Sequence, residues 1–157
     1  MKRTVIYTLL AAMPLVYSCG QNTEKSNSGT AAKQDSLFKN ECYTAVEAKD
    51  KADLMLKIHE GKDVTGNLVI NYFEKGKNDG VISGAYRGDT LFVDYTFKIG
   101  TENPTVYKNP LAFLKRGDSL ILGVGQIETS MGRSYFVKGK PIRFDRSKFI
   151  FGPVECK

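Results

Sequence analysis

Apolar and polar side chains alternate along residues 90–98, and this stretch constrains the fold more than any other. One side of it carries Leu91, Val93, Tyr95 and Phe97. The other side carries Thr90, Asp94, Thr96 and Lys98, and only Phe92 interrupts the alternation. A period of two over this length is typical of a β-strand with one buried face. The fold must therefore contain a sheet that covers an apolar interior.

The residues in front of this strand predict that it forms one arm of a hairpin. Residues 81–86 suit the partner strand, and Arg87-Gly88-Asp89 predicts the reversal between the two strands. We expect Gly88 to have a positive φ, because glycine adopts such turn conformations without steric cost. Asn78-Asp79-Gly80 predicts a second turn before the partner strand, since Asp-Gly is a strong hairpin signal.

The rest of the folded part predicts further short strands. They are expected at residues 42–46, 52–60, 64–75, 111–114, 120–127, 134–138 and 149–154, with turns at 60–63, 116–119 and 129–133. Residues 52–60 would also suit a helix, and residues 100–110 are expected to be irregular. About eight or nine strands at roughly 8–12-residue spacing indicate an all-β fold. Consecutive hairpins favour a small antiparallel up-and-down barrel of about eight strands, with a β-sandwich as the alternative.

Two further features fit a barrel. Closure leaves no exposed strand edge, and glycines within strands suit bends and tight corners. Glycines of this kind are Gly66, Gly84, Gly123 and Gly125. The pattern Arg-Gly-Asp-Thr/Ser-Leu occurs at residues 87–91 and again at 116–120, a spacing of 29 (116 − 87). Arg-Gly-Asp is also known as an adhesion motif, but the same turn used twice is the simpler interpretation.

The N-terminus predicts a signal peptide over residues 1–18. Two basic residues precede an apolar run at 5–16, which is too short to span a bilayer as a helix. Leu15-Val16-Tyr17-Ser18-Cys19 resembles the lipobox of bacterial lipoproteins. The resemblance implies cleavage before Cys19, a diacylglycerol on its thiol and usually a fatty acyl chain such as palmitate on its amino group, which together make anchoring stable. An ordinary secretory signal that ends in cysteine is the alternative.

The residues after the signal peptide predict a tether. Residues 19–36 contain no large apolar side chain, so they cannot bury enough surface to offset the entropy of ordering. Gly20 stands where aspartate in lipoproteins signals retention in the inner membrane, so the resemblance implies the outer membrane of a host that has one. We expect a single barrel domain over residues 37–157, lipid-anchored to the bacterial cell envelope through Cys19.

Cys42 and Cys156 predict a disulfide bond. They lie near the two ends of the expected domain, and exported proteins commonly have paired cysteines. The bond would bring the first and last strands together, as closure of a barrel requires. Two free thiols are the alternative.

Charge gives a weak indication about partners. The chain has 23 Lys and Arg residues against 17 Asp and Glu. Loss of Lys2 and Arg3 with the signal peptide leaves 21 basic and 17 acidic residues, a net charge of +4 (21 − 17). Such a bias can favour an anionic membrane surface or a polyanion, although solubility is the simpler explanation. A bias this small in an exported protein argues against nucleic acid as a partner.

No pattern of chemically active residues predicts catalysis, a metal or a cofactor. The only histidine, His59, lies at a turn beside Glu60. Zinc sites need several His or Cys ligands, and the sequence has neither a G-x-S-x-G elbow nor a phosphate-binding loop. We therefore expect a protein that is not an enzyme and uses no cofactor.

The middle of the chain resembles small bacterial lipoproteins of no assigned function. The shared pattern is G-x-x-x-G-D-T-L-x-x-x-Y-x-F, here Gly84 to Phe97, together with cysteines near both ends of the domain. The resemblance covers most of residues 41–157 and implies no activity. Members tend to carry an arginine in the loop after this pattern, and residues 100–108 lack it. The expected barrel is also similar in shape to lipocalins and other calycins, but their Gly-x-Trp signature is absent from a chain without Trp.

Two functions fit a lipid-anchored barrel. The first is a binding module for a small or apolar ligand, because an eight-stranded barrel can hold one small molecule. Its candidate binding residues are Tyr72, Tyr95, Phe97 and Tyr107. The second is a module that contacts an envelope protein, as an inhibitor or assembly factor, through the loop at 100–110. A cavity lined by the first three aromatic residues would favour the first function, and a filled barrel with an exposed Tyr107 would favour the second.

Overall fold

The structure is a computed structural model that describes residues 38–157. The expected signal peptide over 1–18, and Cys19 with the tether to residue 36, lie outside the described residues. The described residues belong to one compact unit. Its elements are β1 (Phe38–Glu47), β2 (Asp50–His59), the 3₁₀ turn η1 (Glu60–Lys62), β3 (Asp63–Tyr72), β4 (Gly76–Arg87), β5 (Thr90–Ile99), β6 (Tyr107–Arg116), β7 (Ser119–Leu122), β8 (Ile127–Ser130), β9 (Arg133–Phe136) and β10 (Ile150–Val154).

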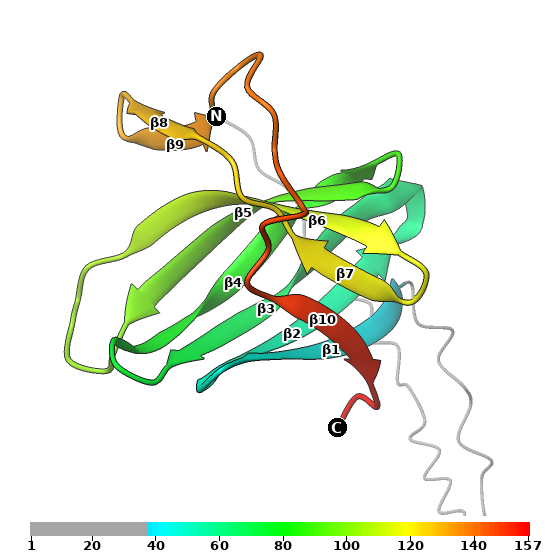
Figure 1. Ribbon diagram of the computed structural model, residues 1–157, viewed down its shortest axis with the longest axis horizontal. Helices are drawn as coiled ribbons and strands as arrows, with labels where there is room; N and C mark the ends of the chain where they lie inside the picture. The colour runs from blue at the N-terminus through cyan, green and yellow to red at the C-terminus, as the bar shows by residue number, and fades with distance from the viewer. Residues whose placement is uncertain (1–37) are drawn as a thin grey trace, which may run out of the picture. The chain divides into compact units, whose positions relative to one another are not determined.

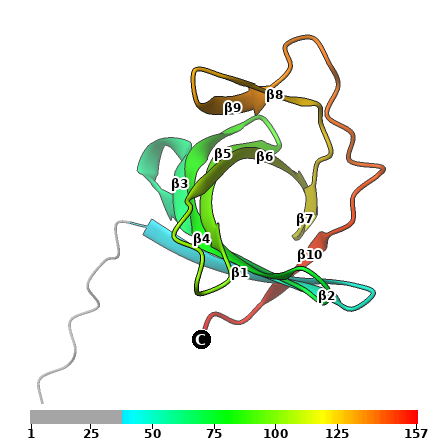
Figure 2. The same ribbon diagram turned by 90° about the vertical axis from the view of Figure 1, so that its left-hand side faces the viewer.

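The fold is a closed antiparallel barrel, as the strand pattern predicted. Its strand order is β1-β10-β7-β6-β5-β4-β3-β2, and β2 pairs in turn with β1. The strands from β1 to β7 follow one another around the barrel in chain order, so the topology is up-and-down (Figures 1 and 2). β10 then fills the remaining gap between β7 and β1. The β-sandwich alternative is excluded.

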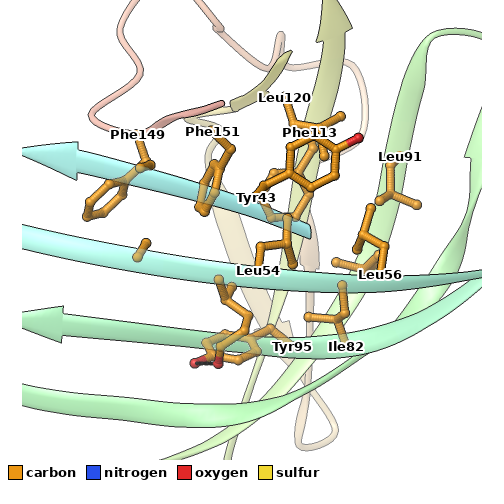
Figure 3. Close-up of a cluster of buried hydrophobic side chains, with 14 of the residues drawn as sticks. Tyr43, Leu54, Leu56, Ile82, Leu91, Tyr95, Phe113, Leu120, Phe149 and Phe151 are labelled. Atoms are coloured by element: carbon orange, nitrogen blue, oxygen red, sulfur yellow. Dashed lines mark hydrogen bonds between the residues drawn. The ribbon is translucent and has the colours of Figure 1, made fainter. Parts of the chain in front are cut away.

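Apolar side chains occupy the barrel interior. The alternating residues of β5 confirm the predicted face, since Leu91, Val93, Tyr95 and Phe97 are all buried. Each strand of the barrel contributes inward residues in the same way, because successive side chains of a strand point to opposite faces. The largest buried side chains, several of which Figure 3 shows together, are Phe113, Phe151, Leu54, Leu56, Leu68, Ile82, Leu91 and Leu120.

The two Arg-Gly-Asp repeats are hairpin turns of the same kind. Gly88 lies between β4 and β5 with a φ of 61°, and Gly117 lies between β6 and β7 with a φ of 60°. The predicted positive φ at Gly88 is confirmed. Only glycine adopts this backbone conformation freely, so the repeated motif has a structural explanation.

The turn expected at Asn78-Asp79-Gly80 is wrong. These residues lie inside β4 and pair with the end of β5. The chain reverses earlier, where Gly76 takes a φ of 81°. Gly80 has a different role, because a Cβ there would overlap the backbone at Phe97. The local Asp-Gly signal is therefore overridden by close approach of two strands.

The irregular stretch expected at 100–110 is too long. β6 begins at Tyr107, which pairs with Phe97, so the loop covers residues 100–106. The presence of Pro110 suggested a break, yet it lies within β6. β7 pairs only with Phe113–Arg116 of β6, so β6 is an edge at Pro110. Edge positions are where strands tolerate proline.

The single strand expected at 120–127 is also wrong beyond Leu122. The chain leaves the barrel after β7, forms the separate hairpin β8–β9, and returns to the barrel at β10. We call residues 123–148 the excursion (orange in Figures 1 and 2). Its glycines allow tight packing, because a Cβ at Gly123 or Gly125 would overlap the side chains of Phe136, Ile142 and Phe144. This small apolar layer packs the start of the excursion against its later part, and the Gly123 amide donates a hydrogen bond of 2.7 Å to the Ala112 carbonyl oxygen of β6.

The predicted disulfide is confirmed. Cys42 in β1 is bonded to Cys156, and their Cα atoms are 5.2 Å apart. β10 meets β1 only at residues 42–44 of that strand. The bond therefore covalently closes the barrel next to one of its shortest strand pairings.

Candidate functional site

Three of the four predicted binding residues form one aromatic row. The ring of Tyr95 stacks on Phe97 with centroids 4.5 Å apart, and Phe97 stacks on Tyr107 at 5.6 Å. Tyr95 and Phe97 are neighbours on the inner face of β5, and Tyr107 opposes Phe97 from β6. The row thus runs from the core to the base of the loop at 100–106.

Tyr95 is a core residue with one satisfied polar group. It is buried, and its hydroxyl donates a hydrogen bond of 2.9 Å to the carbonyl oxygen of Leu68. Burial raises the pKa of the Tyr95 hydroxyl above its usual value, and the nearby Asp79 carboxylate raises it further. The hydroxyl therefore stays neutral at ordinary pH and serves as a structural donor.

Tyr72 lies at the same end of the barrel but outside the row. It ends β3, and its ring meets Phe149 edge-on at 6.5 Å. Burial, and then the charge of Asp50, raises the pKa of Tyr72. A shallow hollow of about 460 Å³ lies beside it. The hollow is lined by Ala48, Lys49, Asp50, Tyr72, Phe73, Glu74, Lys75 and Lys148.

The loop end of the barrel is therefore filled inside and exposed outside. Tyr95 and Phe97 pack with other core side chains instead of facing open space. Tyr107 is 36% exposed, and its neighbour Val106 is 57% exposed. Eight-stranded barrels are just wide enough for side chains to fill them. The arrangement offers an aromatic and aliphatic contact surface around residues 106 and 107.

The opposite end of the barrel holds a polar cluster that the sequence did not predict. The hydroxyl of Tyr43 donates to Glu41 at 2.6 Å, and the Lys39 ammonium contacts the same carboxylate at 2.8 Å. Burial alone would raise the pKa of Glu41, but the hydrogen bonds from Lys39 and Tyr43, together with the charges of Lys39 and Lys115, lower this pKa below its usual value. The buried hydroxyl of Tyr86 has no hydrogen-bond partner among the described residues. The predicted strands contained Tyr43 and Tyr86, but only the folded barrel shows that the two side chains lie at the same end.

A groove of about 820 Å³ separates the hairpin β8–β9 from the outer wall of the barrel. The outward residues Arg87, Phe92 and Asp94 form its floor, and Tyr135 and Phe136 of β9 form one side. The guanidinium of Arg87 lies over the Phe92 ring at 5.4 Å. The strand pattern gave no sign of this groove, because the hairpin was not expected to leave the barrel.

No group of three His, Cys, Asp or Glu side chains within residues 38–157 is placed to hold a metal ion. His59 instead shares a hydrogen bond of 2.9 Å with the Thr65 hydroxyl. In the same residues, no helix has the length and hydropathy needed to cross a membrane. Comparison of the chain with protein-family models, with curated proteins and with solved structures finds no match.

Proposed function

We propose that this chain is a lipid-anchored lipoprotein of the bacterial cell envelope, attached to the membrane through Cys19. The order of basic residues, apolar run, Ser18 and Cys19 supports the anchor. The disulfide between Cys42 and Cys156 fits an oxidising compartment outside the cytoplasm. The absence of aspartate after Cys19 supports the outer membrane.

Its barrel acts as a rigid scaffold for contact with an envelope protein. The observation that carries this proposal is the row Tyr95–Phe97–Tyr107, which fills the barrel end and supports an exposed loop. Binding loops commonly lie on rigid scaffolds, and buried aromatic anchors dominate many interfaces. Val106 and Tyr107 are the expected contacts, and the neighbouring loop would set specificity.

A photo-crosslinking amino acid at Val106 tests the contact in living cells. Val81 provides a matched control, because it is 55% exposed on the outer face of β4 against 57% for Val106. We expect one discrete envelope protein to crosslink at position 106. The crosslinked product should be lost when Tyr107→Ala is introduced into the same chain. Equal crosslinking at both positions, or none at position 106, would contradict the proposal.

The anchor has its own test. Mass spectrometry of the mature protein should show a triacylated or diacylated N-terminal Cys19, and Cys19→Ala should leave an uncleaved or unacylated form. Recovery of mature protein with an unmodified Cys19 would exclude lipoprotein processing.

A small apolar ligand is the second candidate function, supported by a hollow of about 640 Å³ on the outer wall at β1–β3. Apolar residues in its lining include Val46, Met55, Val69 and Val154. Native mass spectrometry of protein purified from the envelope would detect a retained ligand. Met55→Glu should then release it, whereas Tyr107→Ala should not.

A further inference from the structure

The net charge of the mature chain resides in the excursion. Residues 123–148 contain six basic residues and two acidic ones, Glu128 and Asp145, which gives +4 (6 − 2). The remainder of the chain after the signal peptide carries 15 basic and 15 acidic residues (21 − 6 and 17 − 2). One segment of the fold is therefore strongly basic, while the rest is electrically balanced.

Most of these basic side chains are free to meet a partner. Arg143 is paired with Asp145, with 2.5 Å between Nη2 and Oδ2. The other five form no ion pair within residues 38–157 and belong to exposed residues. They are Arg133, Lys138, Lys140, Arg146 and Lys148. Four lysines of the barrel strands, Lys39, Lys51, Lys77 and Lys108, are each paired with a carboxylate.

Exposed apolar side chains accompany this charge. Met131 at the tip of the hairpin is 100% exposed, and the turn is sharp because Met131 and Gly132 both have a positive φ. Tyr135 in β9 is 42% exposed and Ile127 in β8 is 43% exposed. Both views place the hairpin and the loop after it on one side of the barrel (Figures 1 and 2). Basic and apolar groups thus share one projecting structure.

We propose that the excursion docks the domain onto an anionic lipid surface. Lys and Arg side chains are attracted to anionic headgroups, and a projecting apolar tip can enter the boundary between headgroups and acyl chains. An amphipathic tyrosine ring is suited to the same interface. Nucleic acid or an acidic protein would also attract the charge, but neither explains a fully exposed methionine at the tip.

The docking has a consequence for the orientation of the domain. The 19 residue-to-residue steps from Cys19 to Phe38 (38 − 19) can span at most about 65 Å, so an anchor alone allows any face of the domain to approach the membrane. Contact through the excursion would select one face. The loop at 100–106 would then lie at a defined height from the membrane. This inference does not depend on the proposed protein contact at Val106 and Tyr107, and it can be tested on the unacylated domain.

Vesicle co-sedimentation tests the docking. The oxidised domain Gln34–Lys157 is suitable, because the closed barrel, its core and the disulfide all lie within it. We expect binding to vesicles of phosphatidylcholine mixed with phosphatidylglycerol, weak or no binding to phosphatidylcholine alone, and release at high salt. Equal binding to both vesicles, or binding to neither, would overturn the proposal. Binding to heparin or duplex DNA without binding to anionic vesicles would assign the patch to another polyanion.

A charge variant and a matched control locate the contact. In Lys138→Gln/Lys140→Gln/Arg146→Gln, the affinity for anionic vesicles should fall on the order of 100-fold, because each basic side chain near such a surface contributes roughly five-fold. The control Lys62→Gln/Lys75→Gln/Lys98→Gln removes the same charge from exposed lysines elsewhere, which form no ion pair with any residue that the structure describes. The affinity of this control for anionic vesicles should fall much less. Equal losses in both variants would mean that the total charge, and not the excursion, determines binding, which would overturn the proposal.

Insertion of the tip is tested by fluorescence. The chain has no Trp, so Tyr135→Trp introduces a single reporter into the excursion and Phe73→Trp places one on the β3–β4 turn. Anionic vesicles should shift the emission of the Tyr135→Trp variant to the blue and brominated lipid should quench it, while the emission of the Phe73→Trp variant stays constant. If vesicles bind but the emission of the Tyr135→Trp variant does not change, the excursion is attracted to the surface without insertion of its tip. That result would contradict the proposed docking.

Discussion

Tyr95 shows how one residue can resemble a binding residue in the sequence and be a core residue in the fold. Its alternation within β5 predicts an inward side chain, and inside a barrel that position can face either a cavity or a packed core. The structure resolves the choice, since the ring stacks on Phe97 and the hydroxyl donates to Leu68. A buried tyrosine usually finds such a partner for its hydroxyl.

Truncation of Tyr95 should therefore destabilise the domain in two separable steps. Tyr95→Phe removes only the hydrogen bond and should cost about 1 kcal/mol of unfolding free energy. Tyr95→Ala also removes the ring and should cost about 3–5 kcal/mol. Urea unfolding of the domain measures both, and Tyr135→Ala at an exposed position should stay within about 0.5 kcal/mol of wild type. A nearly wild-type Tyr95→Ala protein would make this ring a candidate ligand-binding residue again.

The elements of the barrel depend on glycines at places where two strands come very close. A Cβ at Gly66 would overlap the backbone of Met55 in β2, and a Cβ at Gly84 would overlap the backbone of Phe92 in β5. Neither glycine has a positive φ, so glycine is needed at both positions because a side chain would not fit, and not because of turn geometry. β3 and β4 are thereby able to bend tightly around the core, as strands in closed barrels must.

The strand glycines make a prediction with an internal control. Gly84→Ala should cost about 1–3 kcal/mol or more, because the new methyl group forces β4 away from β5. Gly152→Ala in β10 should be nearly neutral, because no atom of a residue other than its two chain neighbours lies within 4 Å of the added Cβ. Thermal and urea unfolding of the two variants provide the comparison. Equal stability of both would mean that β4 and β5 can separate without loss of packing.

At the scale of the whole molecule, closure of the barrel depends on β10. This short strand meets β1 at residues 42–44 and meets β7 at residues 120–121, while β2 to β5 pair along nearly their full lengths. The excursion lies between β7 and β10 in the sequence, so β10 is the last strand of the barrel along the chain. The bond between Cys42 and Cys156 holds this last strand in place.

Loss of the disulfide should weaken the molecule unevenly. The bond closes a loop with a sequence separation of 114, for which chain entropy predicts a stabilisation of roughly 4–5 kcal/mol before strain. Cys42→Ser/Cys156→Ser should therefore unfold at a much lower urea concentration. Hydrogen exchange should rise first in β10 and β1, with β3 to β5 protected longest. Uniform exchange across all strands would show that the barrel opens only as a whole.

The sequence by itself determined much of this protein. Alternation in residues 90–98, two Arg-Gly-Asp turns and two terminal cysteines predicted an all-β barrel closed by a disulfide, and each of these features is local or covalent. The sequence also placed Tyr95 and Phe97 inside, because a period of two assigns faces without knowledge of the partner strands. It could not distinguish a cavity from a core, since that depends on how inward side chains from all strands fill a common space.

Only the tertiary structure decided where the chain leaves the barrel and what this creates. Asn78-Asp79-Gly80 and Gly123 carry ordinary turn and strand signals, but close approach of β5 at Gly80, and of Ile142 and Phe144 at Gly123, determines their conformation. Such contacts join residues far apart in sequence, so no local pattern encodes them. The strands β8 and β9 of the excursion pair with each other and not with the barrel strands, so a modest net charge is concentrated in one basic, apolar-tipped projection.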